Sequence, residues 1–366
     1  MLLDTCSDIF SGMTRHIRSL AGAITFGALA ALLTGTPAAH AAPPALGGIQ
    51  SVDQTLVRSG EDGRGAERIS GTDRYETANA LAYEIFRDPV RTVFLASGET
   101  FPDALSGSVA AGAANAPVLL TQRDSISDNT LERISRMGAD RVVILGGPSS
   151  VSPVVQNALL ARGLTVDRIG GADRYEVSAA IAGATFNTAP VVFVASGELA
   201  ADSLSAGAGA GKDSPVLLTQ KDTVPQVVLD RIRALQPGRI VVVGGVNTVA
   251  ETAVQQLNAV ATVVRVSGAD RYATSAAVAD LAFSGQRGGT VYIASGQQFP
   301  DALTASAAAI RQDSPVLLVQ DRAIPSSVAA TLETLEPDRV IVLGGPLTIS
   351  DDVVDQLSRY EVIRTR

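Results

Sequence analysis

The sequence has very few of the residues on which most hydrolytic chemistry depends. It contains one cysteine, two histidines and no tryptophan among 366 residues. The cysteine is Cys6 and the histidines are His16 and His40, so all three lie close to the N-terminus. If that segment is removed, the remaining chain has no thiol and no imidazole. This would exclude a Ser-His-Asp triad, a cysteine nucleophile and any zinc site that needs imidazole or thiolate ligands. Carboxylates, arginine, tyrosine, hydroxyls and backbone amides remain available for chemistry.

The first 41 residues have the layout of a secretory signal peptide. A basic cluster around Arg15 and Arg18 precedes an uncharged run at 19–33, and Ala39-His40-Ala41 gives a small-residue cleavage pattern. The alternative is a membrane anchor, but the run is shorter than the ~20 residues that a spanning helix needs. We therefore expect residues 1–41 to be removed, the protein to be secreted to the cell wall or cell surface, and no membrane contact after cleavage.

Charge and composition narrow the class of protein further. Hydrophobic residues make up 46% of the chain and charged residues 18%, which favours a folded protein with a sizeable core. The net charge is −8, and an acidic exported protein is a poor candidate for binding nucleic acid. Residues 42–66 are rich in Pro, Gly and Ala without a sustained period, which predicts a flexible linker.

From residue 67 onward the sequence repeats itself three times. Each copy has five landmarks in the same order: an Arg-(Ile/Val)-x-Gly-x-Asp-Arg-Tyr segment, Ala-Ser-Gly, a Phe-Pro-Asp-Ala-Leu segment, Pro-Val-Leu-Leu and Gly-Gly. The first landmark ends at Tyr75, Tyr175 and Tyr272 in the three copies. The middle copy departs from the pattern where Ala200 and Ala201 replace Phe-Pro. We expect three repeats, at 67–166, 167–263 and 264–366.

Within a repeat, the pattern alternates between strands and helices. Residues 92–96, 118–120 and 141–145 are short continuous apolar runs, as expected of strands buried on both faces. Helical stretches lie between them, at 75–86, 104–114, 128–137 and 153–162. Each repeat therefore has four βα units, which predicts an α/β fold with parallel sheets covered by helices on both sides. The second helix of each copy is rich in Ala and Gly, so we expect it to be buried by close packing.

The Gly-x-Asp-Arg-Tyr corner is the first candidate site. Its aspartates precede a helix and are expected to cap it, together with Glu76 and Glu176 in the first two copies. The cap aspartates are Asp73, Asp173 and Asp270. Capping does not explain the next two residues, because an arginine in the first helical turn is unfavourable for the helix dipole. Either the arginine forms a fixed salt bridge, perhaps to the Phe-Pro-Asp aspartate, or it grips a ligand with negative charge or hydroxyls. Because the corner joins a strand to a helix, we call these residues the junction arginines (Arg74, Arg174 and Arg271) and the junction tyrosines (Tyr75, Tyr175 and Tyr272).

The second corner follows the next strand, at the edge of a parallel sheet where ligands bind. It holds three turn serines (Ser97, Ser196 and Ser295) and three corner aspartates (Asp103, Asp202 and Asp301). The alternative role of each corner aspartate is to cap the following helix. A glycosidase needs two opposed carboxylates, but Glu99 and Glu198 are matched by Gln297 in the third copy, which argues against catalysis. The Gly-Gly corner lacks the Lys-Ser/Thr of a P-loop and predicts a tight turn.

The combined landmarks resemble the type 2 cell-wall-binding repeat of Gram-positive surface proteins, over essentially all of residues 67–366. The resemblance implies three Rossmann-like or flavodoxin-like subdomains around a pseudo-threefold axis. It also implies noncovalent, noncatalytic attachment to an anionic polymer or glycan linked to peptidoglycan, without a cofactor. We expect the junction arginines and tyrosines, the turn serines and the corner aspartates to form the ligand sites. The alternatives are a self-associating structural surface protein and a carboxylate-based peptidoglycan hydrolase.

Overall fold

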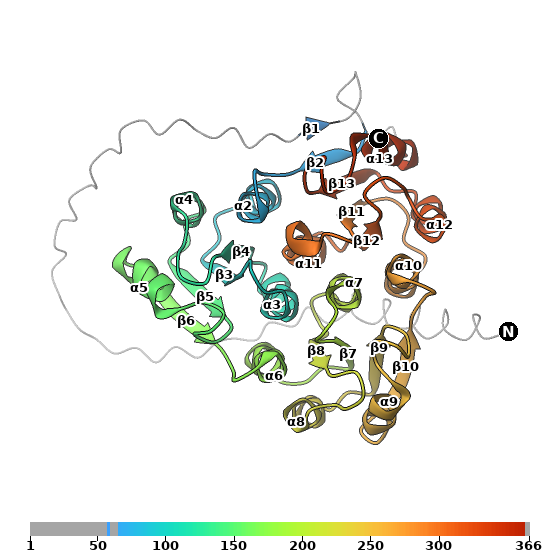
Figure 1. Cartoon of the computed structure of the whole chain (residues 1–366), viewed down its shortest axis with the longest axis horizontal. Coiled ribbons are helices and arrows are strands. Elements are labelled where there is room, and N and C mark those ends of the chain that lie inside the picture. The colour runs from blue at the N-terminus through green and yellow to red at the C-terminus, as the bar shows by residue number, and fades with distance from the viewer. Residues whose placement is uncertain (1–56, 59–64, 363–366) are drawn as a thin grey trace, which may run out of the picture. The chain divides into compact units, whose positions relative to one another are not determined.

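The computed structural model of the chain describes residues 57–58 and 65–362. The predicted signal peptide (1–41) and most of the predicted linker (42–66) lie outside the described residues. The described part contains three α/β units, each built on a parallel sheet of four strands (Figure 1). This confirms the predicted fold class.

The first unit shows how the apolar runs of the sequence become strands. Its sheet has the order β4-β3-β5-β6, and all pairs are parallel. Strands β3, β4 and β5 are buried on both faces, which explains why their sequences do not alternate between apolar and polar residues. The strands are β3 (Thr92–Ser97), β4 (Val118–Thr121), β5 (Arg141–Leu145) and β6 (Thr165–Ile169).

The second and third units repeat this arrangement. The second sheet has the order β8-β7-β9-β10, and the third has β12-β11-β13-β2, with the short β1 added antiparallel to β2. The strands of the second unit are β7 (Val191–Ser196), β8 (Val216–Thr219), β9 (Arg239–Val243) and β10 (Thr262–Val266). Those of the third are β11 (Thr290–Ser295), β12 (Val316–Val319), β13 (Arg339–Leu343), β2 (Glu67–Ile69) and β1 (Val57–Arg58).

Helices connect the strands and cover the sheets. In the first repeat they are α2 (Arg74–Ile85), α3 (Pro102–Ala113), α4 (Asp128–Arg136) and α5 (Pro153–Ala161). In the second they are α6 (Arg174–Thr185), α7 (Ala200–Ala210), α8 (Gln226–Leu235) and α9 (Glu251–Asn258). The third contains α10 (Arg271–Ala282), the 3-10 turn η2 (Phe299–Ala302), α11 (Ala305–Arg311), α12 (Ser326–Leu335), α13 (Asp351–Leu357) and η3 (Ser358–Tyr360).

The repeats in sequence and the sheets in space are out of step by one strand. The strand before each Gly-x-Asp-Arg-Tyr corner completes the sheet of one unit, whereas the helix after it packs on the sheet of the next. Thus β6 lies beside β5, but α6 packs against β8; likewise β2 lies beside β13, but α2 packs against β4. Each of these corners is therefore a junction between two units.

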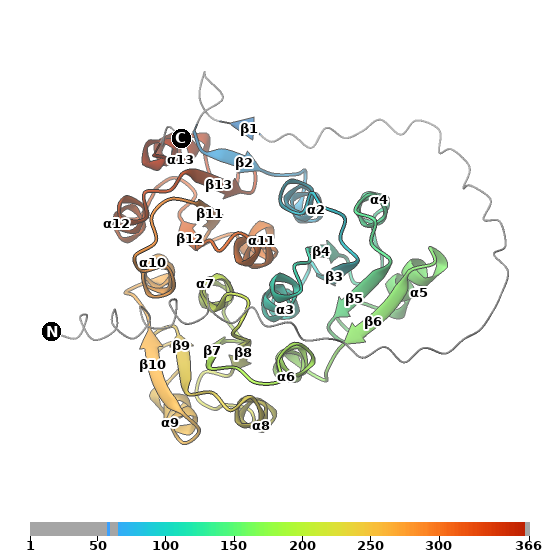
Figure 2. The ribbon, with the colours of Figure 1, turned by 180° about the vertical axis from the view of Figure 1, so that it is seen from behind.

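The Ala- and Gly-rich helices α3, α7 and α11 meet at the centre of the three units (Figures 1 and 2). They are buried, as expected from their small side chains. The contacts leave no room for larger residues: a Cβ added at Gly112 would lie 2.7 Å from Cβ of Ile310, and one at Gly207 would lie 2.5 Å from Oγ of Ser306. Small side chains thus allow three helices to approach one axis.

Candidate functional site

The cap aspartates begin each junction in the predicted way. Oδ1 of Asp73 accepts hydrogen bonds from the backbone N–H groups of Tyr75 and Glu76, at 2.9 Å each. Asp173 does the same for α6, and Asp270 accepts from Ala273 in α10. The glutamate half of the capping box differs from the expectation in the first copy, because Glu76 accepts instead from Asn129 on α4.

The junction arginines are held by main-chain carbonyls of the following Ala-Ser-Gly turn. Nη1 of Arg74 donates to the Gly98 carbonyl at 2.6 Å. The same bond joins Arg174 to Gly197 and Arg271 to Gly296, at 2.5 Å in both cases. Within the described residues, no ion pair of 4 Å or less joins a junction arginine to a corner aspartate. Each junction arginine therefore binds a main-chain carbonyl and not the corner aspartate suggested as its salt-bridge partner. This hydrogen bond fixes the position of its guanidinium.

The junction tyrosines pack on the same turns. A Cβ added at Gly98 would lie 2.6 Å from Cε1 of Tyr75, so this position must remain glycine for the ring to fit. Equivalent contacts join Tyr175 to Gly197 and Tyr272 to Gly296. Burial raises the pKa of all three phenols above its ordinary value, so they are neutral hydrogen-bonding groups at physiological pH.

The corner aspartates face the junctions from the preceding unit, but they do not cap a helix. Asp103 lies one residue inside α3, is only 5% exposed, and accepts a hydrogen bond from Ser150 at 2.8 Å. Thr348 donates to Asp301 in the same way. Burial raises the pKa of each of these carboxyls, while the neighbouring hydroxyl and a junction arginine act in the opposite direction. That arginine comes from the next unit: Arg174 for Asp103, Arg271 for Asp202 and Arg74 for Asp301.

The turn serines are the last residues of β3, β7 and β11, and they are buried. Each is about 1% exposed, and its Oγ accepts the backbone N–H two residues later, as Ser97 does from Glu99 at 3.1 Å. This geometry closes the turn on which the junction tyrosine packs. The structure thus brings a junction arginine, a junction tyrosine and a corner aspartate together at each junction. The turn serine is buried in the turn on which the tyrosine packs.

The three junctions have the same plan but different surfaces. The guanidinium of Arg174 lies 5.8 Å from the ring centre of Phe101. Ala200 stands at the corresponding position beside Arg271, so no ring is available there. Arg174 and Arg271 are exposed, whereas Arg74 is half-buried. Chemically, each junction offers guanidinium N–H donors, a phenol and a buried carboxyl.

A second set of arginines, for which the sequence predicts no role, also supports the junctions. Nη1 of Arg168 donates to the carbonyl of Gly146, the first glycine of the Gly-Gly corner, at 2.9 Å. Arg265 and Arg68 bind Gly244 and Gly344 in the same manner. These glycines have φ values of about +100°, and a Cβ at Gly146 would lie 2.3 Å from the Asp103 carboxylate. The signal was the recurrence of this arginine in all three copies, together with a hydroxyl residue four positions after each first glycine: Ser150, Thr248 and Thr348.

Metal-binding clusters and membrane-spanning helices are two further features that bear on the site. Over the described ranges, no three His, Cys, Asp or Glu side chains are grouped so as to hold a metal ion. Among the helices of the same ranges, none is both long and apolar enough to cross a membrane.

Comparisons with known proteins agree with the geometry. The profile of cell wall binding domain 2 (CWB2) matches residues 68–156, 168–254 and 265–354. The N-acetylmuramoyl-L-alanine amidase LytC of Bacillus subtilis (strain 168) is 27% identical over 303 residues, which cover 82% of this chain and 59% of the amidase. The amidase enhancer of the same strain is 29% identical over 294 residues, or 80% of this chain and 40% of the enhancer.

The fold also matches a solved structure. Cwp6 from Clostridium difficile superposes with a TM-score of 0.76 at 25% identity, covering 81% of this chain and 48% of that one. The chain thus spans 59% or less of the length of each of these three proteins.

Proposed function

Because the chain belongs to the cell wall binding domain 2 family, we propose that it is a noncatalytic protein that attaches noncovalently to an anionic secondary polymer of the Gram-positive wall. The three junctions are the proposed sites. Residues 1–41 would act as its secretion signal, residues 42–66 as a linker, and 67–166, 167–263 and 264–366 as its repeats.

The observation that carries this proposal is the threefold recurrence of a fixed arginine beside a tyrosine. One guanidinium N–H of each junction arginine is bound to a glycine carbonyl, which holds the side chain in place. A guanidinium has five N–H donors, so others remain for phosphate or carboxylate groups of a ligand. Because the stem is already ordered, a ligand has less side-chain entropy to pay for on binding.

Three sites on one body suit a repeating polymer. Once one site is occupied, the others meet ligand at a high effective concentration, so modest site affinities give stable retention. A net charge of −8 opposes approach to an anionic polymer at long range. Attraction must therefore come from the guanidinium groups at short range, which makes retention dependent on ionic strength.

Isolated cell walls provide the test. A variant with Arg74, Arg174 and Arg271 all replaced by lysine keeps the charge but loses the planar fork, and we expect its retention to fall by at least about tenfold. The triple alanine variant should lose retention altogether. Arg233→Ala, which removes an exposed arginine of α8, is the matched control and should bind as the wild type does.

Because the same arginines hold the glycine turns, the thermal unfolding of each variant must be measured alongside. Unchanged retention by a folded triple variant would contradict the proposal. So would equal retention of the wild type on walls stripped of their acidic polymers, a result that does not depend on how the variants fold.

A further inference from the structure

An exposed aromatic ring lies outside the three junctions, near the end of α2. Tyr83 is 53% exposed, and the other exposed large apolar side chains that the structure describes are aliphatic. The chain has only six tyrosines and no tryptophan.

Tyr83 borders a cavity of about 400 Å³ between the ends of α2 and α4. Phe86 and Met137 contribute apolar surface, and Arg87, Arg133 and Arg136 contribute positive charge. Two carboxylates, from Glu84 and Asp88, also line it. Three arginines and two carboxylates thus line the cavity, in a protein whose net charge is −8.

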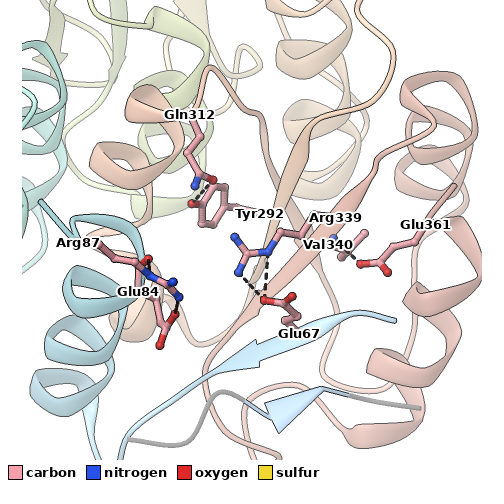
Figure 3. A network of polar contacts seen from close by, with 8 residues as sticks. All are labelled: Glu67, Glu84, Arg87, Tyr292, Gln312, Arg339, Val340 and Glu361. Atoms are coloured by element: carbon pink, nitrogen blue, oxygen red, sulfur yellow. Dashed lines mark hydrogen bonds and ion pairs between the residues drawn. The ribbon is translucent and has the colours of Figure 1, made fainter. Parts of the chain in front are cut away.

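One of these arginines packs on the Tyr83 ring, and the other two are exposed. Arg133 is 8% exposed, and its guanidinium lies 4.7 Å from the centre of the Tyr83 ring. The side chains of Arg87 and Arg136 are 72% and 61% exposed. Arg87, which follows α2, pairs with Glu84, and Arg136 pairs with Glu132 on α4, each at 2.6 Å (Figure 3 for Arg87). Each guanidinium keeps further N–H donors for a ligand.

The other two units show that the repeat fold does not require this cluster. The positions of Tyr83, Arg87 and Arg136 in the second unit are occupied by Gly183, Asn187 and Ala234. In the third unit they are occupied by Asp280, Ser284 and Thr334. The aromatic ring and both exposed arginines are thus confined to the first unit.

We propose that this cavity is an accessory site for a saccharide that carries a carboxylate or phosphate group. The Tyr83 face would pack against the C–H face of the sugar ring, while Arg87 and Arg136 would bind its anionic group. The site rests on the proposed wall function and adds to it a contact that the three junctions do not supply. It also makes the first unit different from the other two in what it recognises.

The absence of tryptophan from the sequence allows a direct test. Tyr83→Trp in the full chain keeps an aromatic face and places a single fluorophore in the cavity. We expect its emission to change saturably with N-acetylmuramic acid, and at least about tenfold more weakly with N-acetylglucosamine, which lacks the carboxylate. Adding Arg87→Ala and Arg136→Ala should weaken the response to N-acetylmuramic acid by a similar factor. Adding Arg233→Ala, which removes a matched helix pair, should leave it unchanged.

An equal response to the two sugars, or an equal effect of the cavity and control variants, would overturn the proposal. The absence of any saturable response would do so as well. Wall retention separates this result from the junction hypothesis. If the triple junction variant loses retention while the fluorophore stays silent, only the accessory site is wrong; if the fluorophore responds while the wild type is not retained, only the junction proposal is wrong.

Discussion

The outer edges of the first and third sheets carry equivalent strand pairs, but the chain connects them differently. In the first unit, β6 follows β5 through α5, so the chain itself holds the two strands near one another. In the third unit, β2 arrives from the other end of the chain and must find β13 without a connection. The pairing is also shorter, with three residue pairs between β2 and β13 against five between β6 and β5.

We call the β2–β13 pairing the closing edge, and its charged side chains are more buried than those of the first unit. Glu67 of β2 pairs with Arg339 of β13, and its side chain is 6% exposed (Figure 3). The corresponding pair in the first unit, Asp167 with Arg141, has side chains 48% and 50% exposed. Removal of one partner at the buried site would leave a charge unpaired away from water, so this contact is the costlier of the two to break.

The largest expected difference between the two edges concerns Arg68 and Arg168. Arg68 is 4% exposed and donates to the carbonyls of Gly344 and Ile349, at 2.6 and 2.8 Å, and to Asp351. We expect Arg68→Ala to lower the free energy of unfolding by about 3 kcal/mol, because charged hydrogen bonds are lost at a buried site. Arg168→Ala, at a half-buried position, should cost about 1 kcal/mol. Urea unfolding of both variants measures the difference, and equal losses would mean that the closing edge is not special.

The acidic residues of the two ion pairs should show a smaller difference in the free energy of unfolding, again with the greater loss at the closing edge. Glu67→Ala leaves Arg339 without this partner at a part-buried site, and we expect a loss of about 2 kcal/mol. Asp167→Ala removes an exposed pair and should cost less than about 0.5 kcal/mol. A double-mutant cycle with Arg339→Ala and Arg141→Ala isolates each pair energy. Similar coupling energies at the two edges would contradict the role assigned to burial.

Much of this fold could be predicted because the information is local. The apolar run at 92–96 became β3, and the helix expected at 104–114 became α3, which begins two residues earlier because Pro102 fits the first helical turn. The cap aspartates and the tight Gly-Gly turns likewise follow from residue chemistry at single corners.

The exchange of strands between units could not be predicted in this way. The strand before each Gly-x-Asp-Arg-Tyr corner is short and mixes apolar with polar residues, and nothing in its sequence distinguishes its own sheet from the preceding one. The bond from Arg74 to the Gly98 carbonyl joins residues 24 positions apart, so it depends on this tertiary arrangement. Tyr83 and Arg136 could not be predicted for another reason: they occur in one repeat only, so the threefold pattern does not mark them.

The smallest expected difference concerns the corner aspartates and pH. Burial raises the pKa of both Asp103 and Asp301, so the folded protein binds a proton at these carboxyls more readily than the unfolded chain. Their contribution therefore favours folding below the ordinary aspartate pKa of about 3.9 and is lost as pH rises through the raised value. Asp103→Asn should remove this dependence, so that the stability of the variant relative to wild type increases from pH 4 to pH 7. The change should be smaller for Asp301→Asn, because Asp301 is more exposed and has two hydroxyls, those of Thr348 and Thr77, to favour its charged form, where Asp103 has only that of Ser150. Unfolding curves at several pH values give the slope of stability against pH for both variants. A larger slope for Asp301→Asn would contradict the effect expected from the greater exposure of Asp301.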